Sequence, residues 1–379
     1  MANRALRLFE LTFAIICLIA LAACGSNPTA CPLSATSTNG CGCGNVPVNA
    51  CAAPSYVFGD GLDGKISTFS VDNSTGELTL ASAVTGPSAS LGMAQLQNRF
   101  LYVSDFQLPS IIDAWSIDLG NGALTPVPGS PFSMGSLSVA AGLATDNVHS
   151  TLYVGDAARI DAFKADATGA ITAISGSPFP GGTNIYLAVD PQGHFLFAAR
   201  IDPPGSVAAY TIDPASGALT AVAGSPFPII PSSMSGVHPA QIAVDTSGKF
   251  VYVTLTSGGV GGFSIDPSTG VLTVIPGSPF TSGVTPLSVA AAGKFLYVGA
   301  DGSVVGYSVD PTTGVLTPVA ASPFSIVTGS LTTNLVGNYL YTAGATGIAA
   351  YKIDPNTGAL TESGSNVPYA GAFVLTFVQ

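Results

Sequence analysis

The sequence predicts an all-β protein, a seven-bladed β-propeller whose blades are four-stranded antiparallel sheets. Three observations support this prediction: one segment recurs seven times, each copy has the pattern of a β-hairpin, and a further pair of strands precedes each hairpin. A repeat of about 40 to 50 residues that holds four short strands is typical of a propeller blade. The turns of β-helical solenoids are shorter, which excludes that architecture.

Each hairpin surrounds a turn that begins with an aspartate and ends with a glycine. In residues 265–280, IDPSTGVLTVIPGSPF, Pro267 fixes φ at the second turn position and Gly270 can adopt a positive φ. The Asp266 side chain can accept backbone N–H bonds, so we interpret the repeated aspartates as turn formers and not as catalytic groups. The turn glycines are Gly76, Gly122, Gly169, Gly217, Gly270, Gly314 and Gly358, 44 to 53 residues apart, and the aspartates are Asp72, Asp118, Asp166, Asp213, Asp266, Asp310 and Asp354.

The strands before each hairpin alternate apolar and polar residues with period 2, as in residues 240–255, AQIAVDTSGKFVYVTL. We name the four strands of a unit a, b, c and d. The repeat region begins on a b-type strand, SYVFGD (55–60), and ends on an a-type strand, GAFVLTFV (371–378). We therefore expect the C-terminal strand to join the N-terminal blade and close the ring, because closure removes unpaired edges.

The N-terminal segment has the pattern of an export signal. Arg4 and Arg7 precede an apolar run over residues 11–23 that is too short to span a bilayer. The sequence Leu-Ala-Ala-Cys (21–24) resembles the lipobox of bacterial lipoproteins, which implies a signal peptide over 1–23, a lipid anchor on Cys24 and attachment to a membrane. Gly25 is compatible with sorting to the outer membrane, so the expected location is the bacterial cell envelope. An ordinary secretory signal is the alternative.

Residues 24–54 are rich in Gly, Ser and Cys without apolar periodicity, which predicts a tether before a propeller over 55–379. Four cysteines in an exported segment predict two disulfides, with three connectivities open: Cys31, Cys41, Cys43 and Cys51. Their spacing matches no zinc pattern, so we expect no metal and no cofactor. The net charge of −11 repels polyphosphate, so nucleic acid is not an expected partner.

Candidate functional residues lie on one face of the ring. The a–b and c–d turns share a regular bottom face, whereas the b–c loops and the d-to-a crossings form an irregular top face, where binding residues are expected. Catalytic candidates there are His238, Arg200 and Asp202. Ligand-binding candidates are Asp60, Asp105, Asp156, Arg159 and Asp301. The sequence holds no G-x-S-x-G, H-E-x-x-H, P-loop or EF-hand motif.

Several blade sequences resemble a known family. AVDPQGHFLFAAR (188–200), AVDTSGKFVYVTL (243–255) and YTIDPASGALTAVAGSPF (210–227) resemble the bacterial lactonase family of seven-bladed propellers, the 6-phosphogluconolactonase-like group. FVYVTL and FLYVGA are also similar to YVTN-type propeller repeats. The resemblance implies a Pro-Arg-His run at the start of an a strand and a glutamate after a b-strand Tyr-Val. This chain has HPAQ (238–241) and YVTL (252–255) there, so Ala240 and Gln241 replace the arginine and the histidine.

Three hypotheses for function follow. The first is a cell-envelope module that binds a small molecule, a glycan or a protein with its top face. The second is a lactone hydrolase with a rebuilt site that uses His238 and aspartates. The site would have to be rebuilt because the family's cation and base, which supply oxyanion stabilisation and proton transfer, are absent from their usual positions. The third is a structural surface module without a defined ligand.

Overall fold

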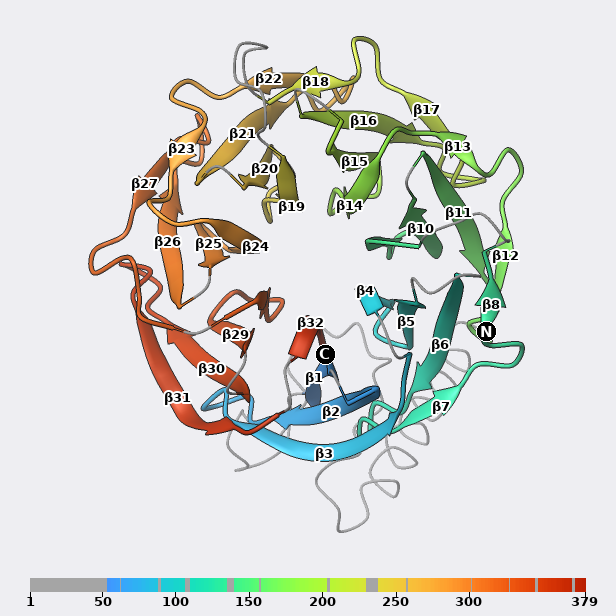
Figure 1. Cartoon of the computed structure of the whole chain (residues 1–379), viewed down its shortest axis with the longest axis horizontal. Helices are drawn as coiled ribbons and strands as arrows, with labels where there is room; N and C mark the ends of the chain where they lie inside the picture. The colour runs from blue at the N-terminus through green and yellow to red at the C-terminus, as the bar shows by residue number, and fades with distance from the viewer. Residues whose placement is uncertain are drawn as a thin grey trace, which may run out of the picture. The chain divides into compact units, whose positions relative to one another are not determined.

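The structure is a computed structural model of the chain, and it describes residues 53–61, 63–87, 90–105, 110–134, 140–156, 158–202, 205–229, 238–256, 258–300, 302–326, 328–344, 347–369 and 372–379. The residues from Ser55 to Gln379 form one compact unit, a ring of seven sheets (Figure 1). This confirms the predicted seven-bladed propeller. The signal segment, Cys24 and the four tether cysteines lie outside the described residues.

The first three blades contain β1 to β13 and the C-terminal strand β32. Blade 1 has β1 (Ser55–Gly61), β2 (Lys65–Val71), β3 (Leu78–Thr85) and β32 (Ala372–Val378). Blade 2 has β4 (Ser90–Leu96), β5 (Phe100–Asp105), β6 (Ile111–Ile117), β7 (Leu124–Pro126) and β8 (Phe132–Ser133). Blade 3 has β9 (Leu143–Asp146), β10 (Thr151–Gly155), β11 (Arg159–Ala165), β12 (Ile171–Ala173) and β13 (Phe179–Pro180).

The remaining blades repeat the same order. Blade 4 has β14 (Asn184–Val189), β15 (Phe195–Arg200), β16 (Ser206–Ile212), β17 (Leu219–Ala221) and β18 (Phe227–Pro228). Blade 5 has β19 (Pro239–Val244), β20 (Phe250–Leu255), β21 (Gly259–Ile265), β22 (Leu272–Val274) and β23 (Phe280–Thr281). Blade 6 has β24 (Pro286–Ala292), β25 (Phe295–Ala300), β26 (Ser303–Val309) and β27 (Leu316–Pro318). Blade 7 has β28 (Ser330–Thr333), β29 (Tyr339–Gly344), β30 (Gly347–Ile353) and β31 (Leu360–Val367).

The C-terminal strand closes the ring as predicted. β32 pairs antiparallel with β1, with Phe377 opposite Val57 and Thr376 opposite Phe58, and it forms the innermost strand of the sheet β3-β2-β1-β32. Leu375, Phe377 and Val378 are buried between neighbouring blades. Blade 1 is therefore assembled from both ends of the propeller.

The hydrophobic core lies between the blades and consists of seven clusters, one for each pair of neighbours. The c–d turn of each blade packs against the b strand of the preceding blade. Tyr252 in β20, for example, donates a hydrogen bond of 2.6 Å to the carbonyl oxygen of Gly314 in the next blade. The same bond runs from Tyr102 to Gly169, from Tyr153 to Gly217 and from Tyr297 to Gly358, at 2.8 to 2.9 Å.

The turn glycine is required for this contact. Gly314 has a φ of +72°, and a Cβ there would lie 2.5 Å from the ring of Phe250, the first residue of β20. The turns at Gly169, Gly270 and Gly358 meet Phe100, Phe195 and Phe295 in the same way. The repeated glycine therefore serves both the turn and the joint between blades.

The turn aspartates act as turn formers, as predicted. The Asp266 carboxylate accepts hydrogen bonds from the backbone N–H groups of Ser268 and Thr269, each at 2.9 Å, and from the Ser268 hydroxyl at 2.6 Å. These bonds, with the Ser268 hydroxyl foremost, hold the pKa of Asp266 at about 2. The pKa values of five further turn aspartates are lowered by the same kind of contact: Asp72, Asp166, Asp213, Asp310 and Asp354.

Five blades share a Ser-Pro segment on their outer edge, and the hydrogen bond that its serine makes was not predicted from the sequence. After a d strand of three residues, a turn leads into the sequence Ser-Pro, and the serine hydroxyl accepts a hydrogen bond from a c-strand N–H group, as Ser130 does from Ala114 at 2.9 Å. The other such serines are Ser177, Ser225, Ser278 and Ser322. In blades 2 to 5 the chain then pairs again with the c strand, so the outer edge is short and interrupted.

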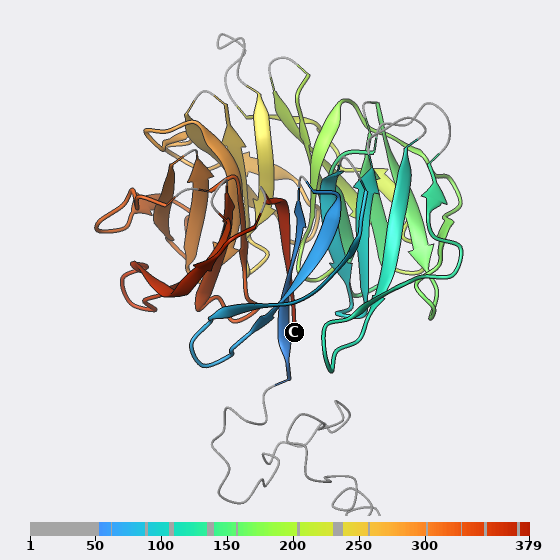
Figure 2. The same cartoon turned by 60° about the horizontal axis from the view of Figure 1, so that its bottom comes forward.

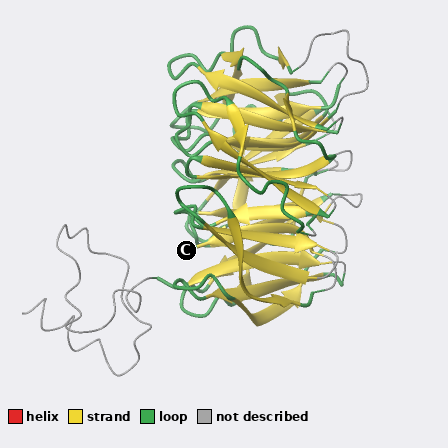
Figure 3. Ribbon diagram, turned by 90° about the vertical axis from the view of Figure 1, so that its left-hand side faces the viewer, coloured by secondary structure: helices red, strands yellow, loops and turns green. Residues whose placement is uncertain are grey.

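The strands cross the thickness of the ring, and the loops lie on its two faces (Figures 2 and 3). The top face carries the b–c loops and the d-to-a crossings, and the bottom face carries the a–b and c–d turns and both ends of the propeller. Over the described residues the chain forms no helix, and hence none that is apolar and long enough to cross a bilayer.

Deletion of residues 372–379 should unfold or aggregate the protein. It removes the buried side chains of Leu375, Phe377 and Val378 and exposes the inner edge of β1. Size-exclusion chromatography and calorimetry measure the effect. A truncated protein that stays monomeric with an unchanged melting temperature would show that β32 does not hold the ring closed.

Acid should destabilise the propeller through its turn aspartates. The folded-state pKa values of these aspartates lie below the unfolded value of about 4. Their contribution to the stability of the fold is therefore complete above pH ~4 and is lost as the pH falls towards 2. Asp266→Ala should lower the melting temperature at pH 7 and flatten its fall in acid, whereas Asp266→Asn should keep most of the stability at pH 7, since an amide oxygen can accept the same bonds. Equal losses in the two variants at pH 7 would assign the effect to the negative charge instead of the local turn.

Candidate functional site

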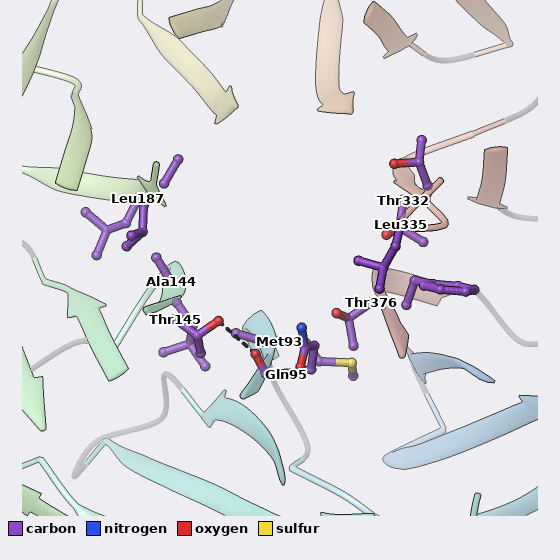
Figure 4. A pocket seen from close by; sticks show the side chains of 14 residues that line it. Met93, Gln95, Ala144, Thr145, Leu187, Thr332, Leu335 and Thr376 are labelled. Carbon is purple, nitrogen blue, oxygen red and sulfur yellow. Dashed lines mark hydrogen bonds between the residues drawn. The ribbon is translucent and has the colours of Figure 1, made fainter. Parts of the chain in front are cut away.

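The a strands surround a central channel that holds two cavities. The upper cavity, near the top face, has a volume of about 160 Å³ and lies among the first residues of the a strands, including Leu91, Gln241 and Ser288. The lower cavity has a volume of about 290 Å³ and extends to the bottom-face turn of blade 7 at Leu335. Figure 4 shows Thr332, Leu335 and Thr376 on one side of the lower cavity and Ala144, Thr145 and Leu187 across it. Met93, Leu143 and Leu187 line both cavities, so the two are contiguous.

The described residues that line these cavities include no carboxylate, ammonium, guanidinium or imidazole group. Their polar groups are hydroxyls and amides, and several of these connect neighbouring a strands. Thr145 donates a hydrogen bond of 2.7 Å to the carbonyl oxygen of Gln95, and Thr333 donates one of 2.9 Å to that of Ala291. The channel wall is therefore electrically neutral and is stiffened by contacts between blades.

Four polar side chains line one side of the upper cavity, among apolar ones. Tyr186, Gln241, Ser288 and Ser330 occupy one equivalent position in the a strands of blades 4 to 7, where they pair with Ala199, Thr254, Gly299 and Ala343 of the b strands. In blades 1 to 3 the equivalent residues are Val374, Gly92 and Gly142.

Three of the polar side chains differ in what they have free to offer a ligand. The Gln241 amide oxygen accepts a hydrogen bond from the backbone N–H of Val289, which leaves the amide nitrogen as a donor. The hydroxyl of Ser288 has no hydrogen-bond partner but is buried against Gly299 of β25, so it is not exposed to the cavity. Burial raises the pKa of Tyr186, so its hydroxyl stays protonated and can donate a hydrogen bond.

The three catalytic candidates of the sequence lie near one another at the top of blades 4 and 5. The Arg200 guanidinium forms an ion pair of 2.9 Å with Asp202, whose carboxylate also accepts hydrogen bonds from the Thr183 N–H and hydroxyl groups. Burial tends to raise the pKa of Asp202, but the bonds from Thr183 and Arg200 outweigh it and lower this pKa. The exposed His238 ring lies 3.1 Å from the carbonyl oxygen of Ile201, between these two residues.

Within the described residues, this arrangement places a main-chain carbonyl oxygen, and no carboxylate, against the His238 ring. A general base needs a group that orients its ring and raises its basicity, usually a carboxylate. The ring nitrogen Nδ1 of His238 faces a main-chain carbonyl, and the nearby Asp202 carboxylate is bound to Arg200 and Thr183 instead. The catalytic role of these three residues therefore stays a prediction.

The predicted ligand-binding residues of blades 1 to 3 lie at the tops of the b and c strands. Arg159 forms ion pairs of 3.1 Å with both Asp156 and Asp161. Asp105 ends β5, where it pairs with Ser90, and both are buried. The described residues contain no cluster of three or more groups suited to a metal ion. Asp301 lies outside the described residues.

Asp60 is the most unusual of these residues. Its side chain is buried where β1, β32 and β4 meet, one carboxylate oxygen accepts a hydrogen bond from the Ser90 hydroxyl, and the other has no partner. Burial raises the pKa of Asp60 to about 6. The Ser90 bond opposes this rise, and the neighbouring charges of Asp63 and Asp105 add to it. Asp60 thus belongs to the joint between blades 1 and 2.

Sequence analysis missed the four polar residues of the upper cavity. Tyr186, Ser288 and Ser330 lie within ordinary strand patterns, and only Gln241 was noted, as a replacement for a family histidine. The four positions could have been found by aligning the seven a strands according to their pairing with the b strands, because the four residues then fall at one position.

Solved structures of several bacterial proteins resemble this chain over most of its length. The 6-phosphogluconolactonase-like protein of Bacteroides uniformis matches with a TM-score of 0.70 and 19% identity, over 86% of this chain and 99% of its own. That of Bacteroides fragilis matches with a TM-score of 0.70 and 20% identity, over 86% and 98%. The periplasmic gluconolactonase of Pseudomonas aeruginosa matches with a TM-score of 0.66 and 19% identity, over 86% and 99%. At these identities the likeness shows the fold. No curated protein sequence matches the chain.

The ring of seven four-stranded blades around a channel defines the class, a seven-bladed β-propeller. Within this class, the family model described as "Lactonase, 7-bladed beta-propeller" matches residues 139–259 and 204–326. The protein is a lactonase-like seven-bladed propeller. The two matches overlap because the blades are repeats of one another.

Asp60→Asn should stabilise the protein at neutral pH. A buried carboxyl with a raised pKa favours folding in its protonated form, so stability is lost as the pH rises through about 6. The variant should gain about 1 to 3 kcal/mol at pH 7 and little at pH 4. Chemical denaturation at both values measures this, with Asp63→Asn on the exposed neighbouring turn as the control. An equal effect of Asp60→Asn at the two pH values would contradict the raised pKa.

Proposed function

We propose that the protein is a cell-envelope binding module whose ligand is a small neutral molecule held at the top end of the central channel. The observation that supports this most directly is the neutral wall of the upper cavity, where hydroxyl and amide groups on blades 4 to 7 stand among apolar side chains. A sugar or a sugar-derived lactone has hydroxyls on its edges and C–H groups on its faces, which suits such a wall. Hydroxyl and amide groups at fixed positions orient a ligand that carries no charge.

The envelope location rests on the N-terminal pattern that ends at Cys24. A protein of the same fold is named a periplasmic gluconolactonase, so propellers of this kind occur outside the cytoplasm. A lipid anchor on Cys24, most simply in the outer membrane, would hold the propeller at the membrane surface.

Binding without catalysis agrees with the side chains present. The positions that carry a cation and a base in the lactonase family hold Ala240 and Gln241 in this chain. Ring opening of a lactone needs stabilisation of a developing oxyanion and activation of water. Neutral hydroxyls and amides contribute little to the activation of water.

Lactone hydrolysis is the second candidate, favoured by one observation. His238 lies beside the loop that carries Arg200 and Asp202, so an imidazole and a guanidinium come together at the top of neighbouring blades. In this mechanism His238 would activate water and Arg200 would stabilise the oxyanion, with Asp202 holding Arg200 in place. The family match is consistent with this candidate.

Binding of D-glucose and of glucono-1,5-lactone by the purified protein, measured by titration calorimetry, tests the first proposal. Tyr186→Phe removes only a hydroxyl and should weaken binding about three- to tenfold, the value of one hydrogen bond to a neutral ligand. The matched control is Tyr351→Phe on β30, away from the channel, which should change nothing. Failure of both probes to bind would contradict the ligand class.

The rate of lactone opening, followed by pH-stat, separates the two candidates. The binding module should not open glucono-1,5-lactone faster than buffer does. Turnover that falls roughly a hundredfold in His238→Ala, but not in the bottom-face variant His194→Ala, would establish the hydrolase instead. If the protein neither binds the two probes nor opens the lactone, the structural module is the hypothesis that remains.

A further inference from the structure

The outer edge of blade 1 differs from the edges of blades 2 to 6. In those five blades the d strand has three residues and is followed by the Ser-Pro segment. In blade 1 the d strand, β3, runs over eight residues, Leu78–Thr85, and contains no proline. Figure 1 shows β3 as a long strand on the outer edge of its blade. It is the last strand of its sheet, so its outer N–H and C=O groups face away from β2.

β3 also lacks the side chains that usually protect an edge. Exposed edge strands avoid pairing by means of charged residues, proline or irregular backbone. The sequence of β3, LTLASAVT, has no charge, and no charged residue occurs from Leu78 to Asn98 in a chain with a net charge of −11. Thr79, Leu80, Ala81, Ala83 and Thr85 are exposed, Leu80 to 52%. The side chains of β3 therefore leave its edge open to an added strand, and its one backbone irregularity is a bulge at Ala81.

The other long outer strand, β31 in blade 7, is better protected. Glu362 places a charge on it, and Gly364 has a φ of +76°, which interrupts the regular backbone. Ser363 of β31 also bonds to the carbonyl oxygen of Thr75 in the turn before β3, so its middle is held by blade 1. β3 is thus the long edge without charge among the described strands.

The sequence of β3 points to its partner. Residues 79–85 read TLASAVT, which is the same in both directions except that Leu80 and Val84 exchange. If Ser82 lies opposite its own copy in an antiparallel pair, then Ala81 faces Ala83, and Thr79 faces Thr85. Such pairs of like residues suit neighbouring strands, since Thr–Thr pairs share hydrogen bonds and branched apolar pairs pack together.

We propose that β3 is a self-association edge, at which two copies of the protein join their blade 1 sheets through antiparallel β3–β3 pairing about a twofold axis at Ser82. The pairing register of β3 with β2 shifts at Ala81, which marks a bulge that adds twist. A second copy has the same twist, whereas a flat foreign strand does not. The contact is one strand wide, so the dissociation constant should be on the order of micromolar.

Sedimentation velocity of the purified protein, from low micromolar to several hundred micromolar, tests the proposal. The protein should pass from monomer to dimer over this range. Ala83→Lys should raise the dissociation constant roughly tenfold or more, because a lysine on an edge strand opposes pairing. The matched control is Ala173→Lys at the end of β12, an exposed alanine on an edge followed by the Ser-Pro segment, which should leave the dimer intact. Equal melting temperatures of both variants confirm that they are folded.

A charge-pair experiment tests the register itself. Ala81→Lys and Ala83→Glu should each weaken the homodimer, and a mixture of the two variants should form a heterodimer tighter than either, because positions 81 and 83 face each other across the axis. A protein that stays monomeric at all concentrations overturns the proposal. A dimer that Ala83→Lys does not weaken, or a mixture no tighter than its components, assigns the contact to another surface.

Discussion

The joint between neighbouring blades holds this propeller together. A glycine without a side chain lets the c–d turn of one blade lie directly against an aromatic ring of the blade before it, as Gly314 does against Phe250, and a buried tyrosine hydroxyl then bonds to the glycine carbonyl. The positive φ and the missing Cβ recur at all seven joints, and an aromatic ring is the partner at six of them, whereas Gly217 meets Thr151. Because the blades contact only their neighbours, seven such joints set the packing of the ring, and the ring in turn sets the bore of the channel.

The polar groups of the two faces are mostly used for stability, which leaves recognition to the channel. Local hydrogen bonds satisfy the turn carboxylates of the bottom face, and these groups have little capacity left for a ligand. The ionisable groups of the top face are mostly paired with one another, as Arg200 is with Asp202. Polar groups that remain available line the channel, where Tyr186 and Gln241 border a cavity without charge. Recognition is thus expected to depend on shape and neutral hydrogen bonds more than on electrostatics.

The sequence predicted the fold because its determinants are local and repeated. The turn at Asp266 and the alternation of the strands around it can be recognised without the rest of the chain, and seven copies fix the blade number. Tertiary contacts could not be predicted in this way. The partner of Tyr252 lies 62 residues further along the chain, and nothing in the Ser-Pro segment indicates that Ser278 accepts a bond from Gly262. Asp60 was expected on an open loop, but Ser90 and β32 cover it. The polar side of the upper cavity becomes visible only when four separate strands are aligned in space.

Because β32 pairs with β1, each repeat of the sequence is offset by one strand from the blade that it helps to form. A repeat in the sequence therefore supplies three strands to one blade and the innermost strand to the next. Duplication or loss of a whole repeat inside the chain would change the number of blades without touching the pair that closes the ring. Blade number is thus open to change by gene recombination, while the closure that keeps the first and last repeats together is inherited unchanged.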